Sequence, residues 1–236
     1  MARAAKKQFG VSYDQSNSLF LYIVIAAFVG GKFFFLFENP SYYLGHPAKL
    51  LGGGGFVFFG SLLFAIPTML WFFKKNRVPV LPMLDVMAVV TCIVHGFGRI
   101  GCFMAGCCHG KPTDSFLSVV FTNPACQAEP LNTPLHPTQL YEAGMIFSIM
   151  AFLLVFKSNK KFDGQMFLIY LISYSIGRSL LEVLRGDIAR GFIVDGWISH
   201  SQFIAIIVIG VSIYFYVKLS RKGKLLTSNT QKHGRR

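Results

Sequence analysis

Six long apolar runs constrain the fold of this chain more than any other feature. Each is about 20 residues long, the length that an α-helix needs to cross a hydrocarbon core of about 30 Å. The runs cover residues 18–37, 52–73, 83–103, 137–156, 164–185 and 199–218. They predict an all-α fold, a polytopic transmembrane helix bundle with about six spans.

Basic residues fill every second break between these runs. On one side of a six-span topology lie 16 of the 23 Lys and Arg residues. They are Arg3, Lys6, Lys7, Lys74, Lys75, Arg77, Lys157, Lys160, Lys161, Lys218, Arg221, Lys222, Lys224, Lys232, Arg235 and Arg236. Because cytoplasmic loops carry the excess of Lys and Arg, we expect both termini to be cytoplasmic. This divides the chain into a cytoplasmic N-terminal segment (1–17), a transmembrane domain (18–218) and a basic cytoplasmic tail (219–236).

The composition favours a membrane protein and argues against nucleic-acid binding. Hydrophobic residues make up 53% of the 236 positions and charged residues 14%, which is too apolar for a soluble domain of this length. A net charge of +13 would suggest a nucleic-acid partner in a soluble protein. Here the basic residues cluster between apolar runs, so we expect membrane lipids as partners and no nucleic acid.

Four charged residues lie at a similar depth within the predicted spans. At about 1.5 Å per residue, Arg99, Arg178 and Lys32 lie roughly 20–22 Å from the cytoplasmic ends of their helices. Glu142 lies roughly 7 Å below the outer end of its helix, in nearly the same layer. Charges at membrane depth are costly, so each indicates a functional site. For Lys32 and for Arg185, the alternative is a side chain that merely extends to the lipid headgroups.

A polar stripe runs along the fifth predicted helix. At i, i+4, i+8 and i+11 lie Tyr174, Arg178, Glu182 and Arg185, on one face. Glu182 can pair with either Arg, and a purely structural pairing is its alternative role. With Arg99 and Lys32 added, the layer carries four cations against Glu142 and Glu182, so we expect it to be net positive. The planar fork of a guanidinium suits the oxygens of a lipid phosphate.

Five glycines surround Arg99 in the segment 95–111 and make a continuous helix unfavourable. They are Gly96, Gly98, Gly101, Gly106 and Gly110. We expect irregular backbone here, which is tolerated at membrane depth where it lines a cavity. Close packing of small residues between helices is the alternative.

The fourth predicted helix opens with residues 136–142, HPTQLYE. Pro137 suits the first helical turn, where its missing N–H is not needed. His136 lies at the water interface beside the charged layer. An imidazole titrates near neutral pH, which suits proton transfer. A structural role is the alternative for this histidine.

The longest break falls on the outer side and is rich in cysteine. Cys107, Cys108 and Cys126 lie in it, and Cys102 lies at the outer end of the third span. On an oxidising side these thiols could form a disulfide, whose pairing the sequence leaves open. A metal site of Cys107, Cys108 and His109 is another alternative. Because adjacent cysteines lack the usual ligand spacing, we expect no metal site.

Five motifs, in order along the chain, resemble those of the prolipoprotein diacylglyceryl transferase family. They are residues 30–33 (GGKF), 53–60 (GGGFVFFG), 98–103 (GRIGCF) with Gly106 and Gly110, 136–142 (HPTQLYE), and the stripe from Tyr174 to Arg185. Their order and approximate spacing agree with the family over roughly residues 6–218. The combination is specific, although each motif by itself is weak.

The resemblance implies a reaction and its participants. A member of this family moves the diacylglyceryl group of phosphatidylglycerol to the thiol of a lipobox cysteine in a prolipoprotein, and glycerol phosphate leaves. It is a multi-pass protein of the inner (cytoplasmic) membrane and requires no cofactor or metal.

The resemblance also implies roles for single residues. Arg99 and Arg178 would bind the phosphate and stabilise charge on the leaving group. His136 or Glu142 would take the thiol proton, because the thiolate is the nucleophile. We therefore expect Arg99, Arg178 and His136 to be catalytic. The expected substrate-binding residues are Lys32, Gly101, Gly110, Gln139, Glu142, Tyr174, Glu182 and Arg185.

Three departures from the family pattern leave alternatives open. Phe59 stands where well-studied members carry an essential His, and Cys102 stands where they carry Asn. Those members also have an additional N-terminal helix, so we expect a truncated start here. The alternatives are a lipid-binding or lipid-moving protein without chemistry, a transferase with another acceptor, and a thiol-redox protein that uses its cysteines.

Overall fold

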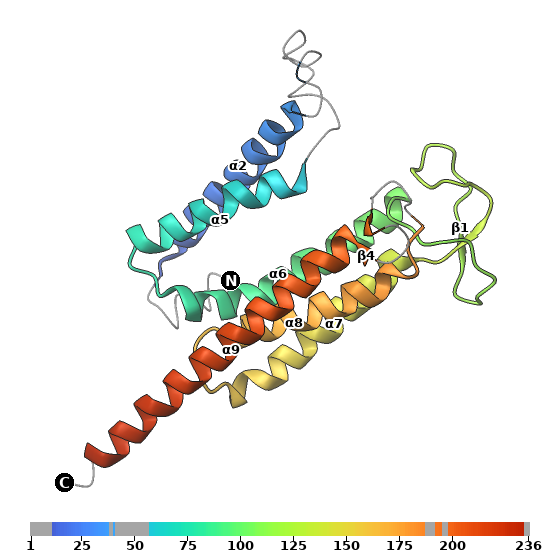
Figure 1. Ribbon diagram of the computed structural model, residues 1–236. Helices are drawn as coiled ribbons and strands as arrows, with labels where there is room; N and C mark the ends of the chain where they lie inside the picture. Colours follow the sequence, from blue (N-terminus) through green and yellow to red (C-terminus); the bar gives the residue numbers. More distant parts are fainter. Residues whose placement is uncertain (1–10, 38–39, 41–56, 187–191, 195–197, 234–236) are drawn as a thin grey trace. The chain divides into compact units, whose positions relative to one another are not determined.

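A computed structural model describes residues 11–37, 40, 57–186, 192–194 and 198–233. This part of the chain is mostly helical, as predicted, and each of the six predicted spans coincides with a helix (Figure 1). Four helices are long and apolar enough to cross a membrane. They are α2 (Tyr13–Leu36), α6 (Val80–Ala105), α7 (Thr138–Phe156, continued by the 3-10 helix η1, Lys157–Asn159) and α9 (His200–His233). The other two are α5 (Phe58–Lys75) and α8 (Gln165–Glu182), and the number of crossings stays a prediction.

Large apolar side chains lie exposed along these helices. Val155 of α7 is 77% exposed, Leu180 of α8 is 69% exposed and Ile206 of α9 is 60% exposed. Soluble proteins rarely leave so much contiguous apolar surface in water, whereas a bilayer solvates it. These faces identify a membrane protein.

The chain divides into two compact units, residues 1–83 and 84–236. In the first, α2 begins with a capping box, in which Ser12 Oγ accepts the amide of Gln15 at 3.1 Å and Gln15 Oε1 accepts the amide of Ser12 at 2.9 Å. α2 packs against α5 through two glycines. A Cβ added at Gly30 would lie 2.3 Å from the carbonyl oxygen of Gly60, and one at Gly60 would lie 2.5 Å from that of Gly30. Glycine at both positions is what lets these backbones approach so closely.

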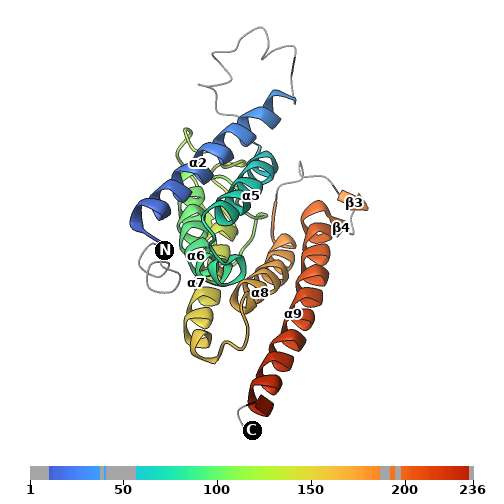
Figure 2. The same ribbon diagram turned by 90° about the vertical axis from the view of Figure 1, so that its left-hand side faces the viewer.

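The second unit packs α6, α7, α8 and α9 (Figure 2). Its core is formed by the first three of these helices, and α9 packs against α8. The buried core residues are Ala88, Cys92, Ile146, Ile149, Leu153, Met166 and Tyr170. α9 continues to His233, so most of the predicted tail 219–236 is helical.

Asp85 ties the start of α8 to α6 at the end that we expect to be cytoplasmic. This carboxylate is 4% exposed. It accepts the amides of Gly164 at 2.8 Å and Phe167 at 3.0 Å, and it forms an ion pair with Lys160 at 3.0 Å. Burial lowers the pKa of Lys160, but its hydrogen bonds to Asp163 and Asp85 outweigh burial and hold that pKa above its ordinary value. A carboxylate at a helix N-terminus satisfies amides that have no partner within the helix.

The expectation of irregular backbone around Arg99 is wrong up to Ala105. α6 is a continuous helix through Gly96, Gly98 and Gly101. Each glycine costs roughly 1 kcal/mol of helix propensity, but in lipid an unpaired backbone amide costs several. The helix is therefore retained until Gly106, where φ is +73° and the helix ends.

The segment between α6 and α7 folds back onto the end of α8. Its strands β1 (Val119–Val120) and β2 (Pro134–Leu135) pair antiparallel. Gly110 bridges Arg185, and the amide of Lys111 donates to the carbonyl of Leu184 at 2.9 Å. A second short pair, β3 (Phe192–Val194) with β4 (Ile198–Ser199), precedes α9.

Some sequence predictions fall outside the described residues. They concern the glycine run 52–55, most of the motif 53–60 and the charges Arg3, Lys6, Lys7, Arg235 and Arg236. Phe59 belongs to α5, and the consequence of its replacing a histidine stays a prediction.

Candidate functional site

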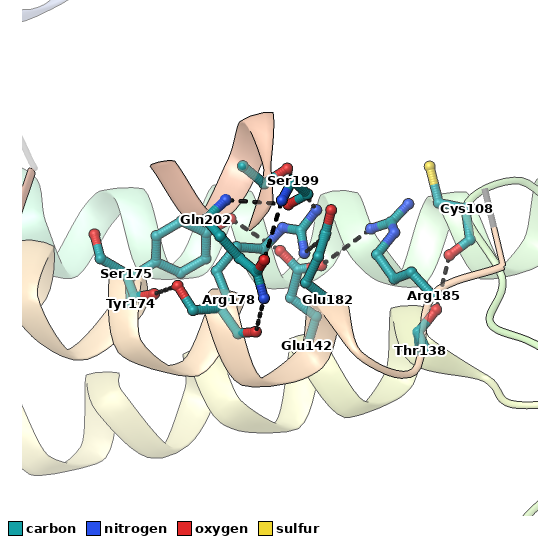
Figure 3. A network of polar contacts seen from close by, with 12 residues as sticks. Cys108, Thr138, Glu142, Tyr174, Ser175, Arg178, Glu182, Arg185, Ser199 and Gln202 are labelled. Carbon is teal, nitrogen blue, oxygen red and sulfur yellow. Dashed lines mark hydrogen bonds and ion pairs between the residues drawn. The ribbon is translucent and has the colours of Figure 1, made fainter. Parts of the chain in front are cut away.

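Glu142 is the centre of a buried polar cluster. It lies on the first turns of α7 and is 1% exposed. Its Oε1 lies 3.1 Å from Nη2 of Arg99 on α6 and accepts the hydroxyl of Tyr174 on α8 at 2.9 Å. Its Oε2 lies 3.8 Å from Nη1 of Arg185, just beyond α8 (Figure 3). A buried carboxylate requires such partners, because burying an unpaired charge is costly.

Arg178 forms the second half of the cluster. Its guanidinium pairs with Glu182 one turn further along α8, and its Nη2 lies 3.4 Å from Ser201 Oγ at the start of α9. Arg178 is 8% exposed. The sequence left open which arginine pairs with Glu182. The structure assigns Glu182 to Arg178, while Arg185 turns to Glu142 (Figure 3).

Within the second unit, the charges of the polar cluster do not cancel. Three guanidiniums, of Arg99, Arg178 and Arg185, face two carboxylates, so the formal excess is one positive charge with histidines neutral. Lys32 belongs to the first unit, where it is 8% exposed with its Nζ 5.8 Å from the ring centroid of Phe35. Its place in the same layer stays a prediction.

His95 is a member of the cluster that the sequence reasoning did not single out. Its Nε2 lies 3.6 Å from Glu142 Oε1, and its ring stacks edge-on against Tyr174 with centroids 5.0 Å apart. A signal for it exists in the sequence, since His95 lies four residues before Arg99 on the same helix face.

His136 lies beside the cluster rather than within it. Its Nδ1 is 3.4 Å from the hydroxyl of Tyr141, and its carbonyl accepts the amide of Gly110 at 2.8 Å. Pro137 stands at the N-cap of α7, one position before the predicted first turn. The catalytic role of His136 stays a prediction.

Gln139 and Gly110 hold the segment between α6 and α7 against the helices that carry the cluster of Glu142. Gln139 is 1% exposed, and its Nε2 donates to the carbonyl of Cys107 at 2.6 Å. A Cβ at Gly110 would lie 2.5 Å from the carbonyl oxygen of Leu184, so only glycine fits against the end of α8. Gly101 differs, because a Cβ there would meet nothing within 4 Å. Substrate binding by Gly101, Gly110 and Gln139 stays a prediction.

The cysteines form no disulfide in the described residues, which include all five of them. Instead, the sulfur atoms of Cys102, Cys107 and Cys108 lie within 4.8 Å of one another. Burial raises the pKa of Cys107 to about 12, with the neighbouring thiols adding to the effect. The sequence missed this cluster because adjacent cysteines resemble no common metal-ligand spacing.

Comparison with known proteins decides the family. The family model for prolipoprotein diacylglyceryl transferase matches residues 1–218. The chain belongs to this family. The match confirms the resemblance predicted from the sequence motifs.

Curated relatives of the family extend along nearly the whole chain. A phosphatidylglycerol–prolipoprotein diacylglyceryl transferase from Clostridium tetani is 35% identical over 211 residues, which is 89% of this chain and 83% of that protein. One from Clostridium perfringens is 33% identical, over 90% of this chain and 82% of that protein. One from Dehalococcoides mccartyi is 28% identical, over 95% of this chain and 85% of that protein.

Proposed function

We propose that this member of the family transfers the diacylglyceryl group of phosphatidylglycerol to the thiol of a lipobox cysteine in a prolipoprotein. The observation that carries the proposal is the buried cluster of three guanidiniums around Glu142 and Glu182, in a chain whose family and relatives bear the name of this reaction. The site lies at the outer leaflet of the inner membrane if both termini are cytoplasmic.

The proposed reaction builds up negative charge on the leaving group, which guanidiniums would stabilise. The acceptor thiolate attacks the carbon of the diacylglyceryl group that bears the phosphate. A carbon–sulfur bond forms, and the bond from that carbon to the phosphate oxygen breaks. Glycerol phosphate leaves with the electron pair of that bond. Its phosphate changes from a diester with one negative charge to a monoester with about 1.5 to 2 at pH 7. Donors that are held in place stabilise such developing charge best.

Arg99 and Arg178 can bind the phosphate without losing their carboxylates. A guanidinium has five N–H donors in a fixed fork. Arg99 places one nitrogen against Glu142, and Arg178 pairs with Glu182. Each therefore has donors left for phosphate oxygens, and the carboxylates hold the forks in place. We assign Glu142, Tyr174, Glu182 and Arg185 to holding this arrangement.

The thiol proton needs an acceptor, and we assign it to His136. Glu142, the other candidate, has both carboxylate oxygens engaged by Arg99, Tyr174 and Arg185. His136 contacts Tyr141 through Nδ1, so Nε2 would take the proton. This requires the tautomer in which Nδ1 carries the hydrogen and donates a hydrogen bond to the Tyr141 hydroxyl oxygen.

The proposal is tested by product formation with the purified, detergent-solubilised protein. A lipobox peptide is incubated in micelles that contain phosphatidylglycerol and analysed by mass spectrometry. We expect a diacylglyceryl mass gain on the cysteine and release of glycerol phosphate. A peptide with Ser in place of the lipobox cysteine is the matched control and should gain nothing.

A second candidate, a lipid-binding protein without chemistry, is favoured by Phe59 at the position of the family's histidine. The same assay separates the two. An active relative serves as the positive control. If phosphatidylglycerol co-purifies with the chain but no product forms, while the relative converts the peptide, the transferase is contradicted and the second candidate is supported.

A further inference from the structure

Three thiols meet where α6 ends, outside the cluster of Glu142. The sulfur atoms of Cys102, Cys107 and Cys108 lie within 4.8 Å of one another, and each residue is partly exposed. The proposed transfer reaction makes no use of them. Within the described residues, no other set of His, Cys, Asp or Glu comes together in this way.

The backbone at this helix end explains why residues five and six apart converge. Gly106 has a φ of +73°, its amide donates to the carbonyl of Phe103 at 3.1 Å, and the amide of Cys107 donates to the carbonyl of Cys102 at 3.1 Å. These two bonds and the left-handed glycine form a Schellman motif. The motif carries Cys107 back over Cys102, whose carbonyl also lies 3.6 Å from the Cys107 sulfur.

Cys108 is brought into the group by a second unusual dihedral. Its φ is +63°, in the left-handed region that residues with a side chain rarely adopt. α7 holds the peptide there, because Thr138 Oγ1 donates to the carbonyl of Cys108 at 2.9 Å and Gln139 Nε2 donates to that of Cys107 at 2.6 Å. Both α7 side chains are at most 2% exposed. Strain of this kind persists where the surroundings over-determine it, and it is common at ligand sites.

The spacing of the sulfurs matches a single soft cation. Two thiolates bound tetrahedrally to one Zn²⁺ at about 2.3 Å lie about 3.8 Å apart. The sulfurs would therefore contract by about 1 Å or less. Thiolates select thiophilic d¹⁰ ions over hard cations. We propose that Cys102, Cys107 and Cys108 bind one thiophilic d¹⁰ cation of the Zn²⁺ class through three sulfurs.

The neighbouring groups define the rest of the coordination. His109 is engaged through both ring nitrogens, since Nδ1 lies 3.0 Å from the carbonyl of Gly110 and Nε2 accepts the amide of Glu129 at 3.3 Å. Cys126 packs against Gly106, where an added Cβ would lie 3.1 Å from its sulfur, and it is not one of the three thiols that come together. The fourth position is thus left to water. On binding, the three thiols release their protons to solvent.

Such an ion would fix the turn after α6 to the end of that helix, next to the cluster of Glu142. Cys102 follows Arg99 by three residues on α6, and the turn is bonded to Thr138 and Gln139, just before Glu142. The inference is independent of the proposed function, because metal binding can be measured without donor lipid or acceptor peptide.

The test is a titration of the reduced, chelator-treated, tag-free protein with Cd²⁺ alone. Cd²⁺ reports thiolate ligands through an ultraviolet charge-transfer band. We expect the band to saturate at one ion per chain. Cys102→Ser, Cys107→Ser and Cys108→Ser should each weaken binding at least tenfold. Cys126→Ser is the matched control and should bind as the unchanged protein does.

A second readout needs no variant and guards against misfolding. Maleimide labelling followed by peptide mass spectrometry is carried out with and without Cd²⁺. Protection of Cys102, Cys107 and Cys108, with Cys126 still labelled, supports the site. Saturation without protection of these three, or a band that survives all three substitutions, would overturn it. So would a reduced protein that takes up no Cd²⁺.

Discussion

At the scale of single residues, Glu142 determines how the polar cluster is built. Arg99 and Tyr174 reach it from α6 and α8, and Arg185 reaches it from three positions beyond the end of α8. Because helix rise is regular, the sequence predicts Arg99 and Glu142 at one depth, and it predicts Tyr174 and Arg185 on one face of their helix. It does not predict which arginine pairs with which carboxylate, because pairing depends on how each helix is rotated about its own axis. That is why His95 was missed and why the partner of Glu182 stayed open.

Glu142→Gln tests this central position. The amide keeps the shape but removes the charge that holds Arg99 and Arg185. We expect the rate of peptide conversion to fall by on the order of 10²-fold and the unfolding free energy to fall by about 3 kcal/mol. Glu129→Gln, at an exposed position, is the matched control. Near-normal conversion by Glu142→Gln would show that the arginines do not depend on this carboxylate.

Tyr141→Phe tests the assignment of His136. Loss of the hydroxyl removes the contact that fixes Nδ1. We expect conversion to fall on the order of tenfold, less than the roughly 10²–10⁴-fold that loss of a general base costs. Tyr214→Phe, on an exposed part of α9, should convert the peptide at the unchanged rate. A normal rate in Tyr141→Phe would contradict the assignment of His136.

At the scale of elements, each predicted apolar run overlaps a helix of the structure. The ends of the helices and their contacts do not follow from the apolar runs. A run of about 20 apolar residues leaves a helix as the only local solution in lipid. Compositional arguments misled at Gly96, Gly98 and Gly101, where the helix persists. The Schellman turn at Gly106 and the cap by Asp85 depend on dihedrals and distant partners, which a local pattern does not carry.

Gly60→Ala tests the close packing of α2 on α5. The new methyl group would meet the carbonyl oxygen of Gly30 at 2.5 Å, and both are backbone groups in helices. We expect a loss of about 1–3 kcal/mol in unfolding free energy, measured by thermal or denaturant unfolding in detergent. Gly144→Ala is the matched control, because a Cβ there meets nothing within 4 Å and alanine favours a helix. Equal stability of the two variants would contradict the packing.

Asp85→Asn tests the anchor of α8. The variant loses the ion pair with Lys160 and weakens the bonds to the amides of Gly164 and Phe167. We expect a loss of about 1–3 kcal/mol in unfolding free energy. Asp163→Asn is the control, since that carboxylate is 56% exposed and its ion pair contributes little. If both variants unfold alike, Asp85 does not hold α6 to α8.

At the scale of the whole molecule, the sequence predicts membrane insertion and family, and the orientation remains to be measured. We expect a protease site inserted after Asn123 to be cleaved by protease added outside spheroplasts. The same site inserted after Asn159 should be protected until the membrane is permeabilised, because the basic breaks stay in the cytoplasm. The opposite pattern would place the cluster of Glu142 at the inner leaflet and rule out an acceptor that arrives from outside.

We propose above all that Arg99 and Arg178 stabilise the charge on the departing glycerol phosphate. The most direct test is the single-turnover rate of lipobox-peptide conversion in phosphatidylglycerol micelles for properly inserted variants. We predict that Arg99→Ala and Arg178→Ala each lower this rate by about 10²–10³-fold. The corresponding lysine variants should recover only part of it, because a point charge does not replace the fork. Arg221→Ala, in α9 at the end expected to be cytoplasmic, should react as the unchanged protein does. Full activity of either Arg99→Ala or Arg178→Ala would contradict the claim.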